Sequence, residues 1–134
     1  MPTIHGLKFV PVLVATLVFW MLGFLWYGVV FMDAWMAGHG LTDDGGSFDI
    51  YMAGGILITF MQVVGIGLVL KWKGVGDVMQ ALTTAGVMWL LIALPLMMYA
   101  YLYLPAHNST LLMIDASHLL VGWLISAGIL TLMK

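Results

Sequence analysis

The chain has 134 residues, of which 63% are hydrophobic and only 7% are charged, and it contains no cysteine. A soluble domain carries about 25% charged residues, so this composition excludes a soluble globular protein and indicates an integral membrane protein. Four Lys or Arg residues in the whole chain are too few for the basic patch that nucleic-acid binding requires, so no nucleic-acid partner is expected.

Four apolar segments are long enough to cross a bilayer as helices. A helix needs about 20 apolar residues to span roughly 30 Å of hydrocarbon. The qualifying segments cover residues 9–32, 50–70, 78–104 and 110–133. Because lipid offers backbone N–H and C=O groups no partners, the segments are predicted to be helices. The predicted fold is an all-α, four-helix integral membrane bundle that forms one transmembrane domain over residues 1–134.

The connections between the spans differ in charge. With four spans, the N-terminus, the second connection and the C-terminus lie on one side, and all the lysines fall there: Lys8, Lys71, Lys73 and Lys134. The first connection, Asp33 to Asp49, is predicted to be a polar loop, and it shares the opposite side with the third connection. By the positive-inside rule, both termini are predicted to be cytoplasmic.

Ionisable residues well inside a span occur in the fourth segment. Asp115 and His118 are three residues apart and therefore share a helical face, roughly 7 and 12 Å below the start of the helix. Ser126 continues this face, and Gln62 of the second span could reach across to it. Intramembrane ionisable groups are candidate functional sites by default. Separately, Pro95 is expected to kink the third span.

Three interpretations of the Asp115–His118 pair remain open. The pair could be structural and tie helices together through interhelical hydrogen bonds. It could be the protonatable site of a small proton- or ion-coupled carrier. It could also contribute to a metal site, or His118 could be an axial ligand of a porphyrin-type cofactor. The candidate metal ligands are Asp33, His39, His107, Asp115 and His118.

The leading hypothesis is a non-enzymatic membrane protein that acts as a homo-oligomer or as an accessory subunit of a larger membrane complex. Small residues are frequent in the spans and allow close helix packing. No nucleophile–base pair, phosphate-binding loop or zinc motif is evident, so no enzymatic activity and no bound cofactor are expected.

The string from Leu25 to Met36 resembles the Trp-Tyr…Phe…Ala-Trp-Met signature of the "domain of unknown function 1761" family of bacterial membrane proteins. The matching aromatic residues are Trp26, Tyr27, Phe31 and Trp35. The Ile114–His118 string is similar to a second element of that family, an Asn/Asp-Ala…His stretch in the last helix. The resemblance implies a four-span protein of the bacterial inner membrane and supplies no biochemical activity.

Overall fold

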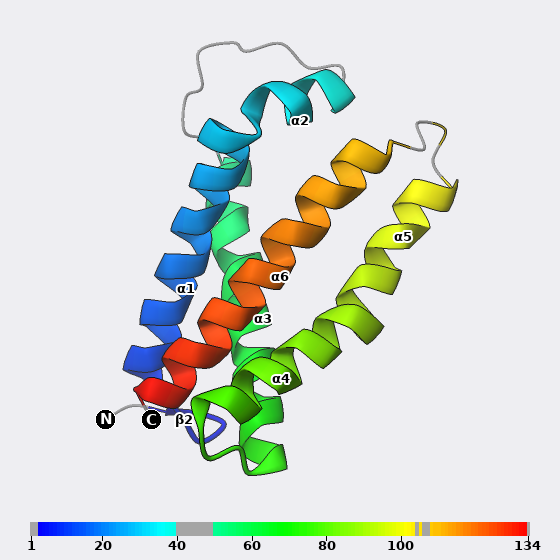
Figure 1. The fold of residues 1–134 in the computed structure, drawn as a ribbon. Helices are drawn as coiled ribbons and strands as arrows, with labels where there is room; N and C mark the ends of the chain where they lie inside the picture. Colours follow the sequence, from blue (N-terminus) through cyan, green and yellow to red (C-terminus); the bar gives the residue numbers. More distant parts are fainter. Residues whose placement is uncertain (1–2, 40–49, 104, 106–107, 134) are drawn as a thin grey trace.

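The computed structural model describes residues 3–39, 50–103, 105 and 108–133 (Figure 1). Two short strands come first, and helical elements follow. The elements are β1 (Thr3–Ile4), β2 (Leu7–Lys8), α1 (Phe9–Leu25), η1 (Trp26–Val30), α2 (Met32–His39), α3 (Ile50–Lys73), α4 (Val78–Met88), η2 (Trp89–Ala93), α5 (Leu94–Tyr103) and α6 (Ser109–Leu132). The elements η1 and η2 are single π-helical turns that continue α1 and α4.

Four of the helical rods are long and apolar enough to cross a membrane. They cover Phe9–Val30, Gly54–Lys73, Val78–Tyr103 and Ser109–Leu132. Many large apolar side chains are exposed along them, as expected where helices contact lipid, and the exposed Lys71, Lys73 and Gln80 lie near the span ends. The predicted fold class, a helical membrane bundle with four candidate spans, is confirmed.

The helix α6 is the centre of the bundle. It packs against α1, α3, α4 and α5, and it also contacts α2. Figure 1 shows α6 between α1 and the α4–α5 rod, with α3 behind. The start of α1, the turn between α3 and α4 and the end of α6 lie at one end, which contains Lys8, Lys71 and Lys73 and is called the lysine end below. The opposite end, where α2 lies, is called the α2 end.

The apolar core consists of two groups of buried side chains. One joins α1 to α3 through Val12, Ala15, Phe19 and Val63, and the other joins α3, α4 and α6. The second group contains three alanines with no exposed surface, Ala81, Ala85 and Ala127. Such small side chains let helices approach closely, which is how membrane helices gain packing energy.

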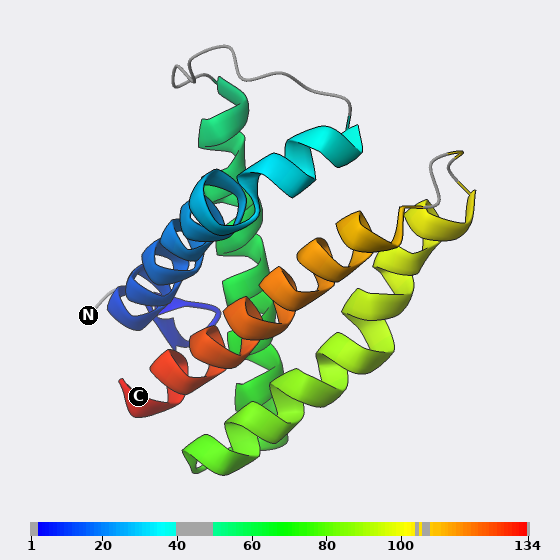
Figure 2. The same ribbon diagram turned by 45° about the horizontal axis from the view of Figure 1, so that its top comes forward.

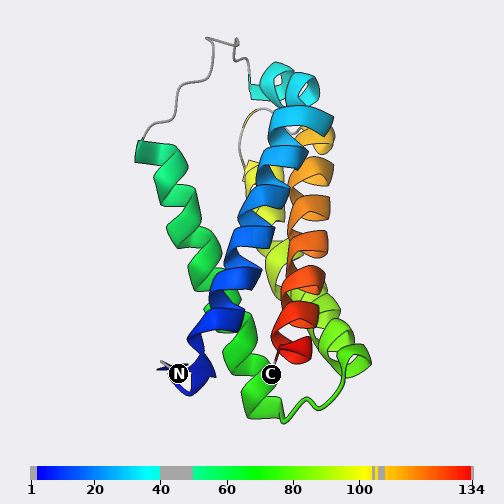
Figure 3. The same cartoon turned by 90° about the vertical axis from the view of Figure 1, so that its left-hand side faces the viewer.

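The helix α3 leaves the bundle toward the α2 end. Figure 2 and Figure 3 show its first turns standing apart from α1 and α6, whereas its last turns lie close to the other helices. The exposure of its side chains changes in the same direction. Val63, Ile66 and Leu70, toward the lysine end, are buried, whereas Leu57, Ile58 and Met61 are each at least 60% exposed. Among the described residues, the face of α3 that remains uncovered is therefore at the α2 end.

The prediction of a polar loop from Asp33 to Asp49 is wrong over its first part. Residues Met32–His39 form the helix α2, which turns away from the direction of α1 (Figure 1). Asp33 lies in the first turn of α2, where a negative charge interacts favourably with the partial positive charge of the helix start. Residues 40–49 lie outside the described residues.

The third span is irregular just before Pro95. The backbone N–H of Leu94 bonds to the carbonyl of Trp89, five residues back, instead of four. Proline removes one helical N–H and crowds the carbonyl four residues before it, and π turns are a known way to absorb such a break. The disturbance that was expected from Pro95 therefore takes the form of a π turn at Trp89–Ala93.

Candidate functional site

The carboxylate of Asp115 accepts a hydrogen bond from another helical rod. The hydroxyl of Tyr27, in η1, donates to Asp115 Oδ1 on α6 at 2.5 Å. Both side chains are partly buried, and both lie inside spans. A carboxylate in lipid needs such a donor because an unsatisfied polar group there costs several kcal/mol.

Two tryptophans from different helical segments donate hydrogen bonds to residues 114–117 of α6. The indole N–H of Trp26 is shared between the carbonyl of Ile114 and the hydroxyl of Ser117, at 3.2 Å each. The indole N–H of Trp89 donates to the carbonyl of Ala116 at 2.9 Å. Trp26 lies in η1 and Trp89 in η2, so both π turns direct an indole at residues 114–117 of α6.

The imidazole of His118 contacts three aromatic rings beside the Tyr27–Asp115 hydrogen bond. The ring centroids of Phe19, Tyr27 and Trp26 are 5.4, 5.0 and 6.5 Å from that of the imidazole. The Nε2 atom is buried and has no hydrogen-bond partner among the described residues. Gly23 faces this atom, since a Cβ built there would lie 3.5 Å from Nε2. The imidazole therefore has one ring nitrogen available for a further interaction.

The other two predicted site residues lie further along α6. Gln62 accepts a hydrogen bond from the indole of Trp123 at 2.8 Å, so the second span does reach across to the fourth. Ser126 has no exposed surface, and its hydroxyl has no partner among the described residues. The structure thus brings together Asp115 and His118, and places Gln62 and Ser126 at separate contacts nearer the lysine end.

The candidate metal ligands are only partly described. The side chain of His39 and the whole of His107 lie outside the described residues, whereas Asp33, Asp115 and His118 lie within them. Within that described part of the chain, no three His, Asp or Glu side chains come close enough to hold a metal ion. The five-residue metal site and the porphyrin-type ligand both stay predictions.

The aromatic string at the end of the first span packs on itself. Trp26 and Phe31 have ring centroids 5.4 Å apart, and Tyr27 and Trp35 have theirs 5.8 Å apart in an edge-on arrangement. Because Tyr27 and Trp26 also bond to α6, this string and the Asp115–His118 stretch form one assembly at the α2 end.

Sequence reasoning missed most of the partners at this site. Trp26 and Tyr27 stand out only as family-motif residues, and Trp89, Ser117 and Trp123 do not stand out at all. Their roles depend on the π turns and on the order of helices around α6, which a hydropathy pattern does not contain. Aromatic donors at the depth of an intramembrane acid are the one signal available in the sequence.

The fold and this site define a multi-pass helical membrane protein in which several interior polar groups, Asp115 and Gln62 among them, are bonded between helices. A protein-family model described as "Protein of unknown function (DUF1761)" matches residues 10–131, and the chain belongs to this family. The membership that the resemblance suggested is thereby confirmed. No curated protein and no solved structure matches the chain.

Proposed function

We propose that this protein is a non-enzymatic membrane subunit that acts by assembly, either with copies of itself or as an accessory subunit of a larger membrane complex. The observation that supports this proposal is the uncovered face of α3. Gly54, Leu57, Ile58, Met61 and Gly65 recur at three- and four-residue steps and therefore share one side of the helix. We call these five residues the α3 face.

The α3 face has the composition of a helix-packing surface. Leu57, Ile58 and Met61 are 60–64% exposed, and no atom of the described residues lies within 4 Å of a Cβ built on Gly54 or Gly65. Two glycines three turns apart leave room for the backbone of another helix, and close backbone approach drives helix association in lipid. A purely lipid-facing surface has no need of that room.

The bonding of Asp115 agrees with this proposal. Its carboxylate is engaged by Tyr27, and residues 114–117 are held by two indoles, which is how polar groups act when they join helices. The lysines at the lysine end support an orientation with both termini in the cytoplasm, and the family resemblance implies the bacterial inner membrane.

Cysteine cross-linking in native membranes tests the assembly. The chain has no cysteine, so Ile58→Cys introduces a single thiol on the α3 face. If copies pair through this face, mild oxidation is expected to give a covalent dimer. The control is Leu91→Cys, which is similarly exposed at 66% but lies on η2 and should stay monomeric.

An accessory role is tested in the same membranes. Gly65→Leu is expected to abolish either the cross-link or co-purification of a fixed partner, because the added side chain occupies the gap on the α3 face. Gly86→Leu, at an equally open position on α4, should leave both unchanged. If Ile58→Cys gives no dimer and the wild-type protein isolates alone as a monomer, the proposal is wrong.

A second candidate function, a small proton- or ion-coupled carrier, is favoured by one specific observation. The imidazole of His118 has an unpartnered Nε2 among the described residues and stacks edge-on against Tyr27, which bonds to Asp115. A carboxylate and an imidazole close together inside a span are the kinds of group that proton-coupled carriers use.

Proteoliposomes with a pH-sensitive dye inside distinguish the carrier from the assembly protein. A carrier moves protons under an imposed pH gradient, and Asp115→Asn should reduce that flux to the level of empty liposomes. The matched control is Thr83→Val, which removes a polar hydroxyl group from the third span at a position away from the site. Flux equal to that of empty liposomes for the wild-type protein, or unchanged by Asp115→Asn, excludes the carrier.

A further inference from the structure

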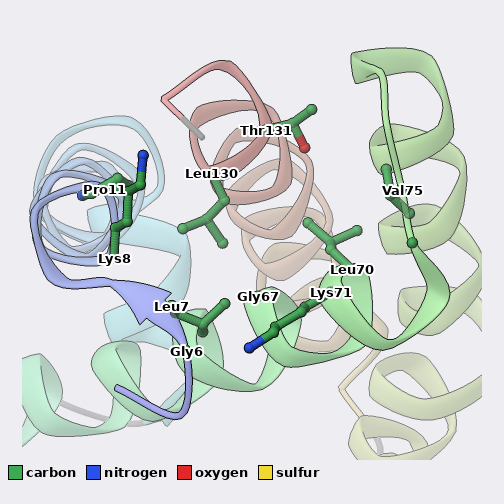
Figure 4. Close-up of a pocket in the computed structure, with 11 residues that line it drawn as sticks. Gly6, Leu7, Lys8, Pro11, Gly67, Leu70, Lys71, Val75, Leu130 and Thr131 are labelled. Atoms are coloured by element: carbon green, nitrogen blue, oxygen red, sulfur yellow. The ribbon is translucent and has the colours of Figure 1, made fainter. Parts of the chain in front are cut away.

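A cavity of about 310 Å³ lies at the lysine end, far from the Asp115 site. It is formed by the β1–β2 hairpin, the last turns of α3 with the turn that follows, and the last turns of α6 (Figure 4). Its position at Leu130 and Thr131 is 15 residues from Asp115 along α6, which corresponds to about 22 Å of helix. The two sites are therefore independent.

The lining of the cavity is mainly apolar and includes two lysines, Lys8 and Lys71, which come from different elements (Figure 4). Leu7, Leu70 and Leu130 approach it from the hairpin, α3 and α6, as Figure 4 shows. Lys8, Lys71 and the hydroxyl-bearing Thr131 are its polar members, and no acidic residue is among the described residues that line it. A ligand that fits must combine an apolar part with a negative charge.

The β1–β2 hairpin contacts Lys71 at the edge of the cavity. Residues His5 and Gly6 connect the two strands with positive φ angles of 50° and 85°, the backbone pattern of a tight two-residue turn. Lys71 Nζ donates to the carbonyl of His5 at 3.2 Å. The ammonium group of Lys71 lies against Gly6, whose φ of 85° favours glycine at this position.

The hairpin itself is seated tightly on α3. A Cβ on Gly67 would lie 2.7 Å from Leu7 Cδ1, so this glycine lets the hairpin approach the helix. Lys71, which bonds to the hairpin, and Lys8, at the end of β2, are both exposed side chains beside the cavity. Two ammonium groups thus flank an apolar cavity at the depth where spans end.

We infer that this cavity binds an anionic phospholipid, with the phosphate between Lys8 and Lys71 and the first part of an acyl chain against Leu7, Leu70 and Leu130. The span Phe9–Val30 starts directly after Lys8, and the span Gly54–Lys73 ends just after Lys71, so both lysines lie at headgroup depth. Basic pockets between spans are a recognised way of binding anionic headgroups. The inference does not depend on the proposed assembly through α3.

Lipid-dependent thermal stability of the purified protein in a neutral detergent tests this site. Dioleoyl phosphatidylglycerol is expected to raise the midpoint of unfolding in a saturable manner, and dioleoyl phosphatidylcholine, with the same chains, is not. Lys8→Gln and Lys71→Gln should each weaken the apparent affinity about fivefold, the ratio expected for one basic group near an anionic headgroup. Lys73→Gln is the matched control, since Lys73 bonds to Thr84 and does not line the cavity.

A second variant separates the cavity from general charge attraction. Thr131→Trp fills the cavity while keeping both lysines, and it should abolish the phosphatidylglycerol effect. Three results would each overturn the inference. Both lipids could raise the midpoint equally, the phosphatidylglycerol effect could survive Thr131→Trp and both lysine variants, or inorganic phosphate alone could give the same shift.

Discussion

Replacing Gly122 with alanine is expected to destabilise the folded protein by about 1–3 kcal/mol, the usual cost of overpacking a full core. A Cβ at this position would lie 2.3 Å from Phe19 Cε1 and 2.6 Å from Cδ1 and Cζ. The ring of Phe19 is 1% exposed and cannot move aside without separating α1 from α6. Reversible unfolding in mixed micelles, followed by tryptophan fluorescence, measures the effect.

The control for this variant is Gly128→Ala in the same helix. No atom lies within 4 Å of a Cβ built on Gly128, so the added methyl group meets open space. Alanine is the better helix former by roughly 0.5–1 kcal/mol, so this variant should be as stable as the wild-type protein or slightly more so. Equal destabilisation by both substitutions would show that the Phe19 contact is not the cause. Adding Phe19→Leu to Gly122→Ala should recover part of the loss, because the two side chains are in contact.

Tyr27→Phe is expected to lower the free energy of unfolding by about 1–2 kcal/mol, the upper range for an interhelical hydrogen bond in a membrane. The substitution keeps the ring and its contact with His118, but it removes the hydroxyl that donates to Asp115. The carboxylate then loses this donor inside the span. The same unfolding assay measures this loss.

Two further variants make this prediction specific. Tyr103→Phe, at a residue that is 77% exposed, should change stability by less than about 0.5 kcal/mol. In a double-mutant cycle, Tyr27→Phe should cost less in the Asp115→Ala background than in the wild-type background. An identical cost in both backgrounds would show that the Tyr27–Asp115 bond does not contribute.

The number of spans followed from the sequence because an apolar helix in lipid leaves a clear signal. A chain that must satisfy its backbone without water crosses the bilayer as continuous apolar helices, and the lysines in alternate connections follow the separate positive-inside bias. The helix α2 was missed because Asp33, Gly38 and the glycines that follow suggest a turn, whereas the aromatic and methionine side chains from Met32 to Met36 continue the helix.

The site was predictable only in part. Asp115 and His118 were identifiable because an ionisable residue inside a span is costly and therefore conspicuous. Their partners were not, since a bond such as Trp89 to Ala116 depends on which helices are neighbours and on how far each has turned. Local propensities carry neither kind of information. The lysine-end cavity was also beyond sequence reasoning, because it requires a two-residue turn to fold back against α3 and α6.

The π turns η1 and η2 also affect how this chain can be compared with its relatives. A π turn holds one residue more than the α-turn that it replaces, and one residue corresponds to about 100° of rotation about the helix axis. The side chains before and after Trp26–Val30 are therefore out of phase by that angle, and the same holds across Trp89–Ala93. A family member that lacks one residue at either place would form a straight helix with its second half turned to a different side. A one-residue gap at these positions in an alignment would thus mark a change in which residues face α6.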